Sequence, residues 1–368
     1  MRIVQLANLY SPVSGGLRTA VDALGRGYAE AGHERVLVVP GKVFARRETD
    51  VGLVVTVPGP SVAPGYRFVL DPRPVLRVLE RLRPDVIEVS DKATLAVAAR
   101  WAGRHGVRSV LFSHERLDAI LAHRVPGPFP LSQAADCWNR RLVSIFDAVV
   151  VTSSFGAAEF ARVGAPALHR VPLGVDLDTF RPLPAAPSSS EPDEVRLVHL
   201  GRLSAEKRPG LALAAVAELH RRGVPVRLDV LGEGPLGPSL RKAAARLPVT
   251  FHGHVGSRAD VARLLASADA ALAPCPVESF GLAVLEALAC GTPVVAADLG
   301  AAGELLVRGA GLVARPTGEG FADAVTELLG WPSSWRRRAA RGRAECYPWS
   351  ASIAGMLAVH TGGGVRVR

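Results

Sequence analysis

The segment DVIEVSDKATLAVAARWAGRHGVRSVLFS, residues 85–113, decides the class of fold. Two apolar, β-branched runs, DVIEVS and SVLFS, flank a stretch rich in Ala, Leu and Arg with the pattern of an amphipathic helix. A strand, a crossover helix and a second strand form the unit from which parallel sheets are built. The segment therefore predicts an α/β protein with a parallel sheet.

The same alternation runs along the chain on both sides of this segment. Further strand candidates in the first half are RIVQLA, RVLVVP, GLVVTVP and AVVVTSS. After PLPAAPSSSEPDE, which is rich in Pro, Ser and acidic residues, the alternation restarts with VRLVHLG, VRLDVLGEG, VTFHG, ADAALAP, TPVVAAD and GAGLVA. We predict two doubly wound, Rossmann-like parallel-sheet domains, one at 1–181 and one at 195–346, joined by a linker at 182–194.

Composition limits the classes of protein that the chain can belong to. Its 368 residues suit two domains, and 48% hydrophobic residues exclude a disordered protein. No apolar run reaches the ~18 to 20 residues of a membrane span, and the first residues form a strand pattern, so we expect a cytoplasmic protein. The four cysteines lack metal or disulfide spacing. A net charge of +10 favours an acidic partner, which leaves nucleic acid, an anionic membrane surface and a phosphorylated substrate open.

Open α/β sheets bind ligands beyond the carboxyl ends of their strands, so we look for chemistry there, in the cleft between the domains. Gly15 and Gly16 follow the first strand and open a helix, where backbone N–H groups suit an anion, although an ordinary tight turn explains the pair as well. Arg202 and Lys207 follow the first strand of the second domain. Together they could neutralise one diphosphate, or they could be solvated surface charges.

The stretch ESFGLAVLEALACGTPVV, residues 278–295, places two glutamates around the start of an apolar helix. We expect the helix at 282–289, with Ser279 as its N-cap. Glu278 then lies beside the first N–H groups of the helix, and Glu286 lies no more than ~12 Å further along. Either glutamate alone suits a capping or ion-pairing role, but the pair favours an extended ligand that has hydroxyls at both ends and phosphates between them.

The motifs SGGLRTA, SHERLD, PLGVD, GRLSAEKRP, LGEGPL and ESFGLAVLE together resemble those of the retaining glycosyltransferases of family 4. That family has the GT-B fold, in which two Rossmann-like domains face each other across a cleft. Within it, ANLYSPVSGGLRTAVD, LRPDVIEVSDKATL and SHERLD resemble actinobacterial mannosyltransferases that extend phosphatidylinositol mannosides, especially the enzyme that adds the third mannose. YPWSASIAGMLAVH resembles the family's final helix, so residues 347–368 are expected to cross back to the N-terminal domain.

The resemblance implies that a hexose, most simply mannose from GDP-mannose, is transferred in α linkage to a glycolipid acceptor such as a phosphatidylinositol mannoside. A soluble enzyme that uses another nucleotide sugar to modify a small metabolite remains the alternative. A basic nucleic-acid-binding protein is a remote one, because the chain shows no basic platform interleaved with aromatic residues. No metal is expected. Asp176 and Asp178 form a DxD pattern, but they belong to the family's GVD loop.

Residue roles follow from the resemblance as well. Arg202 and Lys207 would neutralise the leaving diphosphate, Glu278 would hold sugar hydroxyls, and His114 would lie near the reacting sugar on the acceptor side. These four are the expected catalytic residues. The expected donor-binding residues are Gly15, Gly16, Arg202, Lys207, His254, Val255, Glu278, Phe280, Gly281, Leu282 and Glu286, of which Glu286 would hold the ribose. A histidine that caps the next helix is the alternative for His114.

One departure from the family weakens the guanine assignment. Relatives that use GDP-mannose often carry an aspartate after the GxV turn, where this chain has Gly256 and Ser257. Backbone contacts from His254 and Val255 would then have to read the base.

The segment DPRPVLRVLERLRPD predicts a basic amphipathic helix. Arg73, Arg77 and Arg81 fall on one side of the expected helix, and Leu76, Leu79 and Leu82 fall on another. Such a helix could bind an anionic bilayer at the inner face of the plasma membrane, or it could be an ordinary surface helix in an arginine-rich protein.

Overall fold

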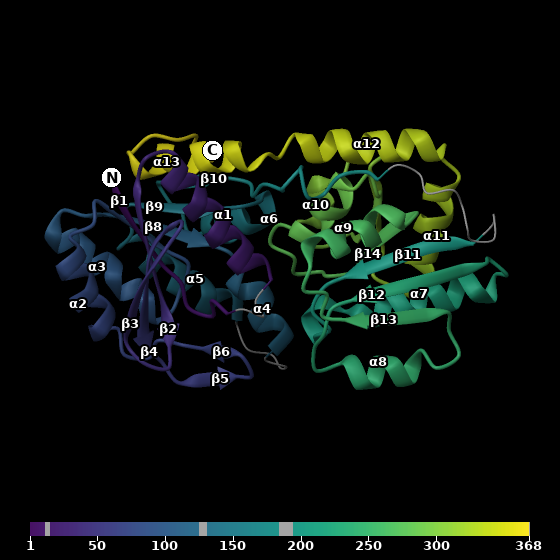
Figure 1. Cartoon of the computed structure of the whole chain (residues 1–368), viewed down its shortest axis with the longest axis horizontal. Coiled ribbons are helices and arrows are strands. Elements are labelled where there is room, and N and C mark those ends of the chain that lie inside the picture. Colours follow the sequence, from purple (N-terminus) through teal and green to yellow (C-terminus); the bar gives the residue numbers. More distant parts are fainter. Residues whose placement is uncertain (12–14, 125–130, 184–193, 368) are drawn as a thin grey trace. The chain divides into compact units, whose positions relative to one another are not determined.

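The computed structural model describes residues 1–11, 15–124, 131–183 and 194–367 (Figure 1). These residues form two compact units: unit 1 contains Met1–Leu173 and Trp349–Arg368, and unit 2 contains Gly174–Pro348. The prediction of two doubly wound parallel-sheet domains is confirmed. Most of the predicted linker, residues 184–193, lies outside the described residues, so its assignment stays a prediction.

Unit 1 is built on a sheet whose described strands lie in the order β10-β9-β8-β7-β1-β2-β4-β3. All neighbouring pairs in this order are parallel except β3 with β4. The strands are β1 Arg2–Leu6, β2 Glu34–Gly41, β3 Ala45–Thr49, β4 Gly52–Pro58, β7 Val86–Val89, β8 Arg108–Ser113, β9 Ala148–Val151 and β10 Leu168–Arg170, with a small hairpin of β5 Ser61–Ala63 and β6 Tyr66–Arg67. The helices are α1 Gly16–Glu30, α2 Arg73–Leu82, α3 Val97–His105, α4 Leu117–Arg124, α5 Leu131–Val143, α6 Ser154–Ala161 and α13 Trp349–His360, with a 3₁₀ turn at Thr94–Ala96.

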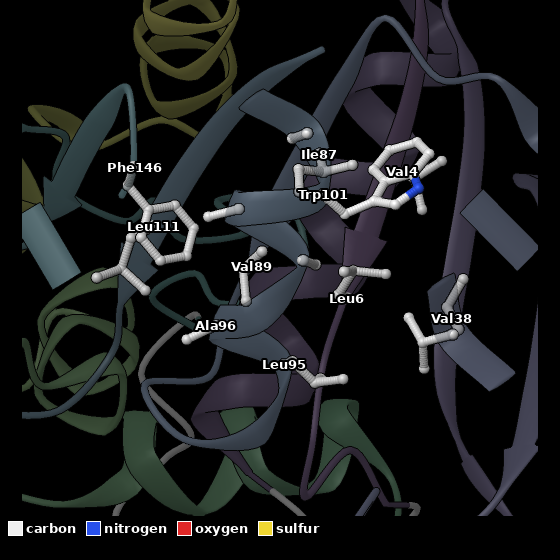
Figure 2. Packing of buried hydrophobic residues seen from close by; sticks show 14 of the residues in the cluster. Val4, Leu6, Val38, Ile87, Val89, Leu95, Ala96, Trp101, Leu111 and Phe146 are labelled. Atoms are coloured by element: carbon white, nitrogen blue, oxygen red, sulfur yellow. The ribbon is translucent and has the colours of Figure 1, made fainter. Parts of the chain in front are cut away.

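The two faces of this sheet differ because side chains alternate along each strand. Val4 and Leu6 of β1 and Ile87 and Val89 of β7 face a large apolar core that includes Trp101 of α3 (Figure 2). Burial of the sheet explains why its central strands are mostly apolar in the sequence, with Gln5 in β1 and Glu88 in β7 as polar exceptions. The edge strand β3, ARRET, is largely exposed and gave no such signal.

The opposite face of the sheet carries a buried polar network centred on Glu88. Its carboxylate accepts hydrogen bonds from Gln5 Nε2 at 3.0 Å and from the Tyr28 hydroxyl of α1 at 2.7 Å. His360 Nε2, at the end of α13, lies 3.3 Å from Glu88 Oε2, and both side chains are fully buried. Burial alone would raise the pKa of Glu88, but His360, Gln5 and Tyr28 lower it below its ordinary value. The network therefore joins the final helix to the central strands of unit 1.

Helix α2 presents its arginines to solvent and its leucines to the core. Leu79 and Leu82 are buried and Leu76 packs against the same core, whereas Arg77 and Arg81 are exposed. The apolar side of the basic helix is therefore occupied by the protein's own interior.

Unit 2 has a parallel sheet whose described strands lie in the order β13-β12-β11-β14-β15-β16. They are β11 Val195–Leu200, β12 Val226–Leu231, β13 Val249–Gly253, β14 Ala270–Ala273, β15 Val294–Ala297 and β16 Gly311–Ala314. The helices are α7 Pro209–Arg221, α8 Gly237–Ala243, α9 Arg258–Ser267, α10 Leu282–Ala289, α11 Gly318–Leu329 and α12 Ser333–Glu345, with 3₁₀ turns at Ala205–Lys207 and Ala302–Leu305. Each predicted strand of this half is present.

Candidate active site

The predicted site residues of unit 2 follow three strands of one sheet, β11, β13 and β14. Because β13, β12, β11 and β14 are parallel and adjacent, the loops that follow them leave the sheet at the same edge. Arg202 and Lys207 follow β11, His254 and Val255 follow β13, and Glu278 follows β14.

The loop that carries Arg202 is fixed by the glycine-rich loop after β12. The backbone N–H of Leu203 donates to the carbonyl of Glu233 at 3.0 Å, and the N–H of Leu236 donates to the carbonyl of Leu203 at 2.9 Å. A Cβ atom on Gly234 would lie 2.4 Å from the Leu203 carbonyl oxygen, so only glycine allows this approach. The Arg202 side chain is exposed at the end of this fixed backbone.

Lys207 and Glu278, predicted from separate motifs, are in direct contact. Lys207 Nζ lies 2.7 Å from Glu278 Oε2, and the two side chains are partly buried. Burial alone would lower the pKa of Lys207, but the Glu278 carboxylate raises it above its ordinary value. The lysine is therefore held as a cation beside the strand ends.

Helix α10 begins differently from the prediction. Gly281, with φ of 101°, is the N-cap residue, and no side chain caps the helix. The prediction of Ser279 as N-cap was wrong. The chain enters this helix through a residue in the left-handed conformation, which glycine adopts without strain. Phe280 is buried, and Leu282 is the first helical residue. The carbonyl of Glu278 accepts a hydrogen bond from the N–H of Ala301 at 2.7 Å, which fixes the backbone just before the helix.

Glu286 lies in the second turn of α10, and its side chain is 15% exposed. Burial raises its pKa to about 7, the nearby Arg258 lowers it, and Asp176 raises it. Arg258 Nη2 is 4.0 Å from Glu286 Oε1. No sequence motif predicted this arginine, although it directly follows Gly256 and Ser257, where the chain departs from the family pattern. His254 is exposed and Val255 partly buried in the same loop before α9.

Asp176, from the DxD pattern, forms a turn in this structure. Its Oδ1 accepts hydrogen bonds from the backbone N–H groups of Asp178 and Thr179, at 3.2 and 2.9 Å, which makes it a turn-forming residue. In the described ranges, no group of three or more His, Cys, Asp or Glu side chains is placed to hold a metal ion.

In unit 1, Gly15 is the N-cap residue of α1 and Gly16 its first residue. A Cβ atom on Gly15 would have no heavy atom of the described residues within 4 Å, so their packing does not require a glycine here. Residues 12–14 of the same motif lie outside the described residues.

His114 follows β8, and its Nε2 lies 3.1 Å from the hydroxyl of Ser90, which follows the neighbouring β7. Its ring packs against Phe112, with 4.1 Å between ring centroids. Burial lowers the pKa of His114 to about 4, so the imidazole is neutral near pH 7. The first N–H of α4, on Leu117, donates to Glu159 Oε2 at 2.9 Å.

A buried ion pair that no sequence motif predicted supports the His114 loop. The fully buried carboxylate of Glu159 pairs with the ammonium group of Lys92, in the loop after β7. Lys92 Nζ also donates to the carbonyl of Glu115 at 2.7 Å. This pair therefore joins the two loops that follow β7 and β8.

Comparison with known proteins now identifies the family. Residues 14–179 match the family described as Glycosyltransferase Family 4, and residues 194–330 match Glycosyl transferases group 1. Over 365 residues the chain is 46% identical to the GDP-mannose-dependent alpha-(1-6)-phosphatidylinositol dimannoside mannosyltransferase of Mycobacterium tuberculosis (strain ATCC 25177 / H37Ra), covering 97% of this chain and 95% of that protein. The chain belongs to glycosyltransferase family 4.

This glycosyltransferase has further relatives. It is 29% identical over 363 residues to the GDP-mannose-dependent alpha-(1-6)-phosphatidylinositol monomannoside mannosyltransferase of Mycobacterium tuberculosis (strain CDC 1551 / Oshkosh), covering 89% of each chain. Its fold is similar to that of sucrose-phosphate synthase from Thermosynechococcus elongatus, with a TM-score of 0.79, 19% identity and 98% of each chain covered. The glycosyltransferase WaaG gives a TM-score of 0.71 at 18% identity, covering 98% of this chain and 100% of WaaG. The predicted family and the GT-B fold are confirmed.

The close approach of Gly234 to the loop that carries Arg202 predicts that a larger residue at 234 reduces activity. Gly234→Ala forces the loop after β11 to move, because the new Cβ would meet the Leu203 backbone; we expect kcat/KM to fall at least about tenfold, a loss of ~1.4 kcal/mol in transition-state binding. Steady-state kinetics with purified protein measures it. Gly237→Ala is the matched control, because its Cβ would have only an ordinary 3.9 Å contact with the Leu203 side chain. Equal effects of the two variants would contradict the prediction.

Proposed function

We propose that this glycosyltransferase transfers mannose from GDP-mannose, with retention of configuration, to a phosphatidylinositol mannoside. Support comes from the mycobacterial relative whose name specifies that donor and a dimannoside acceptor, at 46% identity over nearly the whole of both chains. The observation that carries the proposal is the Lys207–Glu278 pair, which brings a cation and a carboxylate together where neighbouring strands end.

In the proposed mechanism, the diphosphate leaves with its negative charge neutralised by Arg202 and Lys207. Fixed cations at the site where charge develops stabilise the transition state without having to reorganise. Lys207 is already held by Glu278 and needs only to exchange part of that contact for a phosphate oxygen. Glu278 accepts hydrogen bonds from hydroxyls of the transferred sugar, next to the uncapped start of α10, which favours a phosphate.

The remaining proposed contacts are with the nucleoside of the donor and with the acceptor side of the transferred sugar. Glu286 accepts the ribose hydroxyls, and the backbone of His254 and Val255 contacts the base. Neutral His114 hydrogen-bonds a sugar hydroxyl on the acceptor side, because a neutral imidazole offers both a donor and an acceptor nitrogen. We infer that the reaction requires no metal, because these two cations supply the charge that a metal would otherwise provide.

We further propose that unit 1 binds the anionic membrane surface on which a lipid acceptor resides. Arg73, Arg77 and Arg81 of α2 are exposed, and Phe44, which is 48% exposed, lines a hollow together with Arg77 and Arg81. Because the leucines of α2 lie in the core, the contact is through arginines and a neighbouring aromatic side chain and not through insertion of the helix. None of the described helices is both long and apolar enough to cross a bilayer. Nucleic acid is not a proposed partner.

The donor and acceptor are tested by nucleotide release from GDP-mannose, UDP-glucose, UDP-N-acetylglucosamine and dTDP sugars, each with and without phosphatidylinositol mannoside in liposomes. We expect release from GDP-mannose only when the lipid is present, at a rate that EDTA leaves unchanged. Turnover of another donor without the lipid would instead support modification of a small metabolite. Loss of activity in EDTA that added Mg²⁺ restores would contradict the metal-independent mechanism.

The two glutamates are expected to affect different kinetic constants. Glu278→Gln should lower kcat at least about a hundredfold, the size of effect seen when one group that stabilises a transition state is removed. Glu286→Gln should mainly raise the KM for the donor, by about tenfold or more, because it weakens a charged hydrogen bond to the ribose. Exposed Glu319→Gln is the control and should change neither constant by more than about twofold. Full activity of both site variants would exclude the assignment.

Membrane binding is expected to depend on the position of the arginines and not only on net charge. Arg77→Gln with Arg81→Gln should weaken binding to vesicles containing phosphatidylinositol about thirtyfold, since each basic residue near the surface contributes ~1 kcal/mol. The matched control is Arg100→Gln with Arg104→Gln, which removes the same charge from exposed sites on α3. Vesicle co-sedimentation measures both. An equal loss in the two double variants would show that α2 is not the contact surface.

A further inference from the structure

Arg258 is placed between two carboxylates near the proposed ribose site. Its Nη2 atom lies 4.0 Å from Glu286 Oε1 and 3.9 Å from Asp176 Oδ2. Both distances allow an ion pair but are longer than a hydrogen bond. The guanidinium group therefore acts on both carboxylates through its charge.

Arg258 packs against Phe180, and its place at the start of α9 does not favour a positive charge. Its guanidinium lies over the ring of buried Phe180, 4.9 Å from the ring centroid, and the Phe180 N–H donates to the carbonyl of Asp176 at 2.9 Å. Arg258 is also the first residue of α9, where the helix dipole disfavours a cation. Stability of α9 thus gives no reason for an arginine here, whereas the neighbouring carboxylates do.

The charged and titratable groups around Glu286 come from several elements. Arg258 approaches from α9, Asp176 from the turn after β10, and the Cys290 thiol from the C-cap of α10. Arg341 of α12 donates to the carboxylate of Glu345 and to the carbonyls of Leu177, Phe180 and Ala289. Among the described residues, Arg258 is the cation within ion-pair distance of the Glu286 carboxylate.

We propose that Arg258 is a positioning residue for Glu286, holding its carboxylate ready to accept the ribose hydroxyls of the donor. This inference rests on the proposed role of Glu286. Without the cation, burial and the negative charge of Asp176 would both favour the protonated carboxyl, which is a weaker acceptor for hydroxyl groups. Arg258 thereby affects nucleotide binding without contacting the nucleotide.

The sign of the pH effect follows from the raised pKa of Glu286, which is about 7. Nucleotide affinity should rise as pH increases through 7 and become constant above it, because only the ionised carboxylate accepts two hydroxyl donors well. Removing the positive charge of Arg258 raises the pKa of Glu286 further. The rise in affinity then moves to higher pH.

The test is calorimetric titration of GDP into wild type, Arg258→Gln and Arg258→Lys between pH 6 and pH 9. If the pKa of Glu286 rises by about one unit, Arg258→Gln should bind GDP about fivefold more weakly at pH 7, about ninefold more weakly at pH 6 and nearly as well as wild type at pH 9. Arg258→Lys keeps the charge and should follow the wild-type profile more closely. The GDP phosphate also titrates, but it does so equally for every variant. Its titration therefore cancels in the ratio of variant to wild-type affinity at each pH.

Two controls separate the possible outcomes. Arg263→Gln removes an exposed arginine of the same helix, paired with Asp260, and should leave the profile unchanged. A loss in Arg258→Gln that is the same at every pH would overturn the positioning role. Glu286→Gln should bind weakly without this pH dependence. Wild-type affinity of Glu286→Gln at pH 9 would instead overturn the proposed ribose contact on which the inference rests.

Discussion

The parallel pairing of β11 between β12 and β14 is the constraint on which the donor side of this enzyme depends. It makes three loops leave the sheet at one edge, so residues more than 70 positions apart in the chain meet there, as Lys207 and Glu278 do. The glycines after β12 then let two of these loops touch through their backbones. A hydrogen-bonding pattern that stabilises the sheet therefore also determines the geometry of the charged side chains.

Each carboxylate of the proposed donor site faces a cation of the protein. Lys207 pairs directly with Glu278, and Arg258 lies at ion-pair distance from Glu286. Taking a charge out of water is expensive unless another charge compensates it, so these pairs reduce the cost of keeping carboxylates partly buried. They also give each cation a partner within the protein. In the proposed mechanism Lys207 changes partner when the donor binds, whereas Arg258 keeps its partner.

Much of this arrangement could be predicted from the sequence, because it depends on patterns that are local in the chain. Apolar β-branched runs gave the strands, and the motifs around Lys207 and Glu278 gave residues that the structure brings into contact. The contribution of Arg258 depends on a distance across the fold to Glu286, and no local pattern encodes it. The start of α10 was mispredicted because Ser279 is a good N-cap by type, whereas the backbone at Gly281 needs a left-handed residue. The edge strand β3 was missed because its side chains are polar and exposed.

The place of His360 in the Glu88 network has a consequence for how the protein is made. Residues 349–360 are synthesised after the whole of unit 2, yet they contribute a buried partner to the central strands of unit 1. Domains generally fold as units during synthesis, the N-terminal one first. Here unit 1 emerges from the ribosome first, but its Glu88 carboxylate has no histidine partner until the last helix has been synthesised. By then the described strands of unit 2 have all been synthesised.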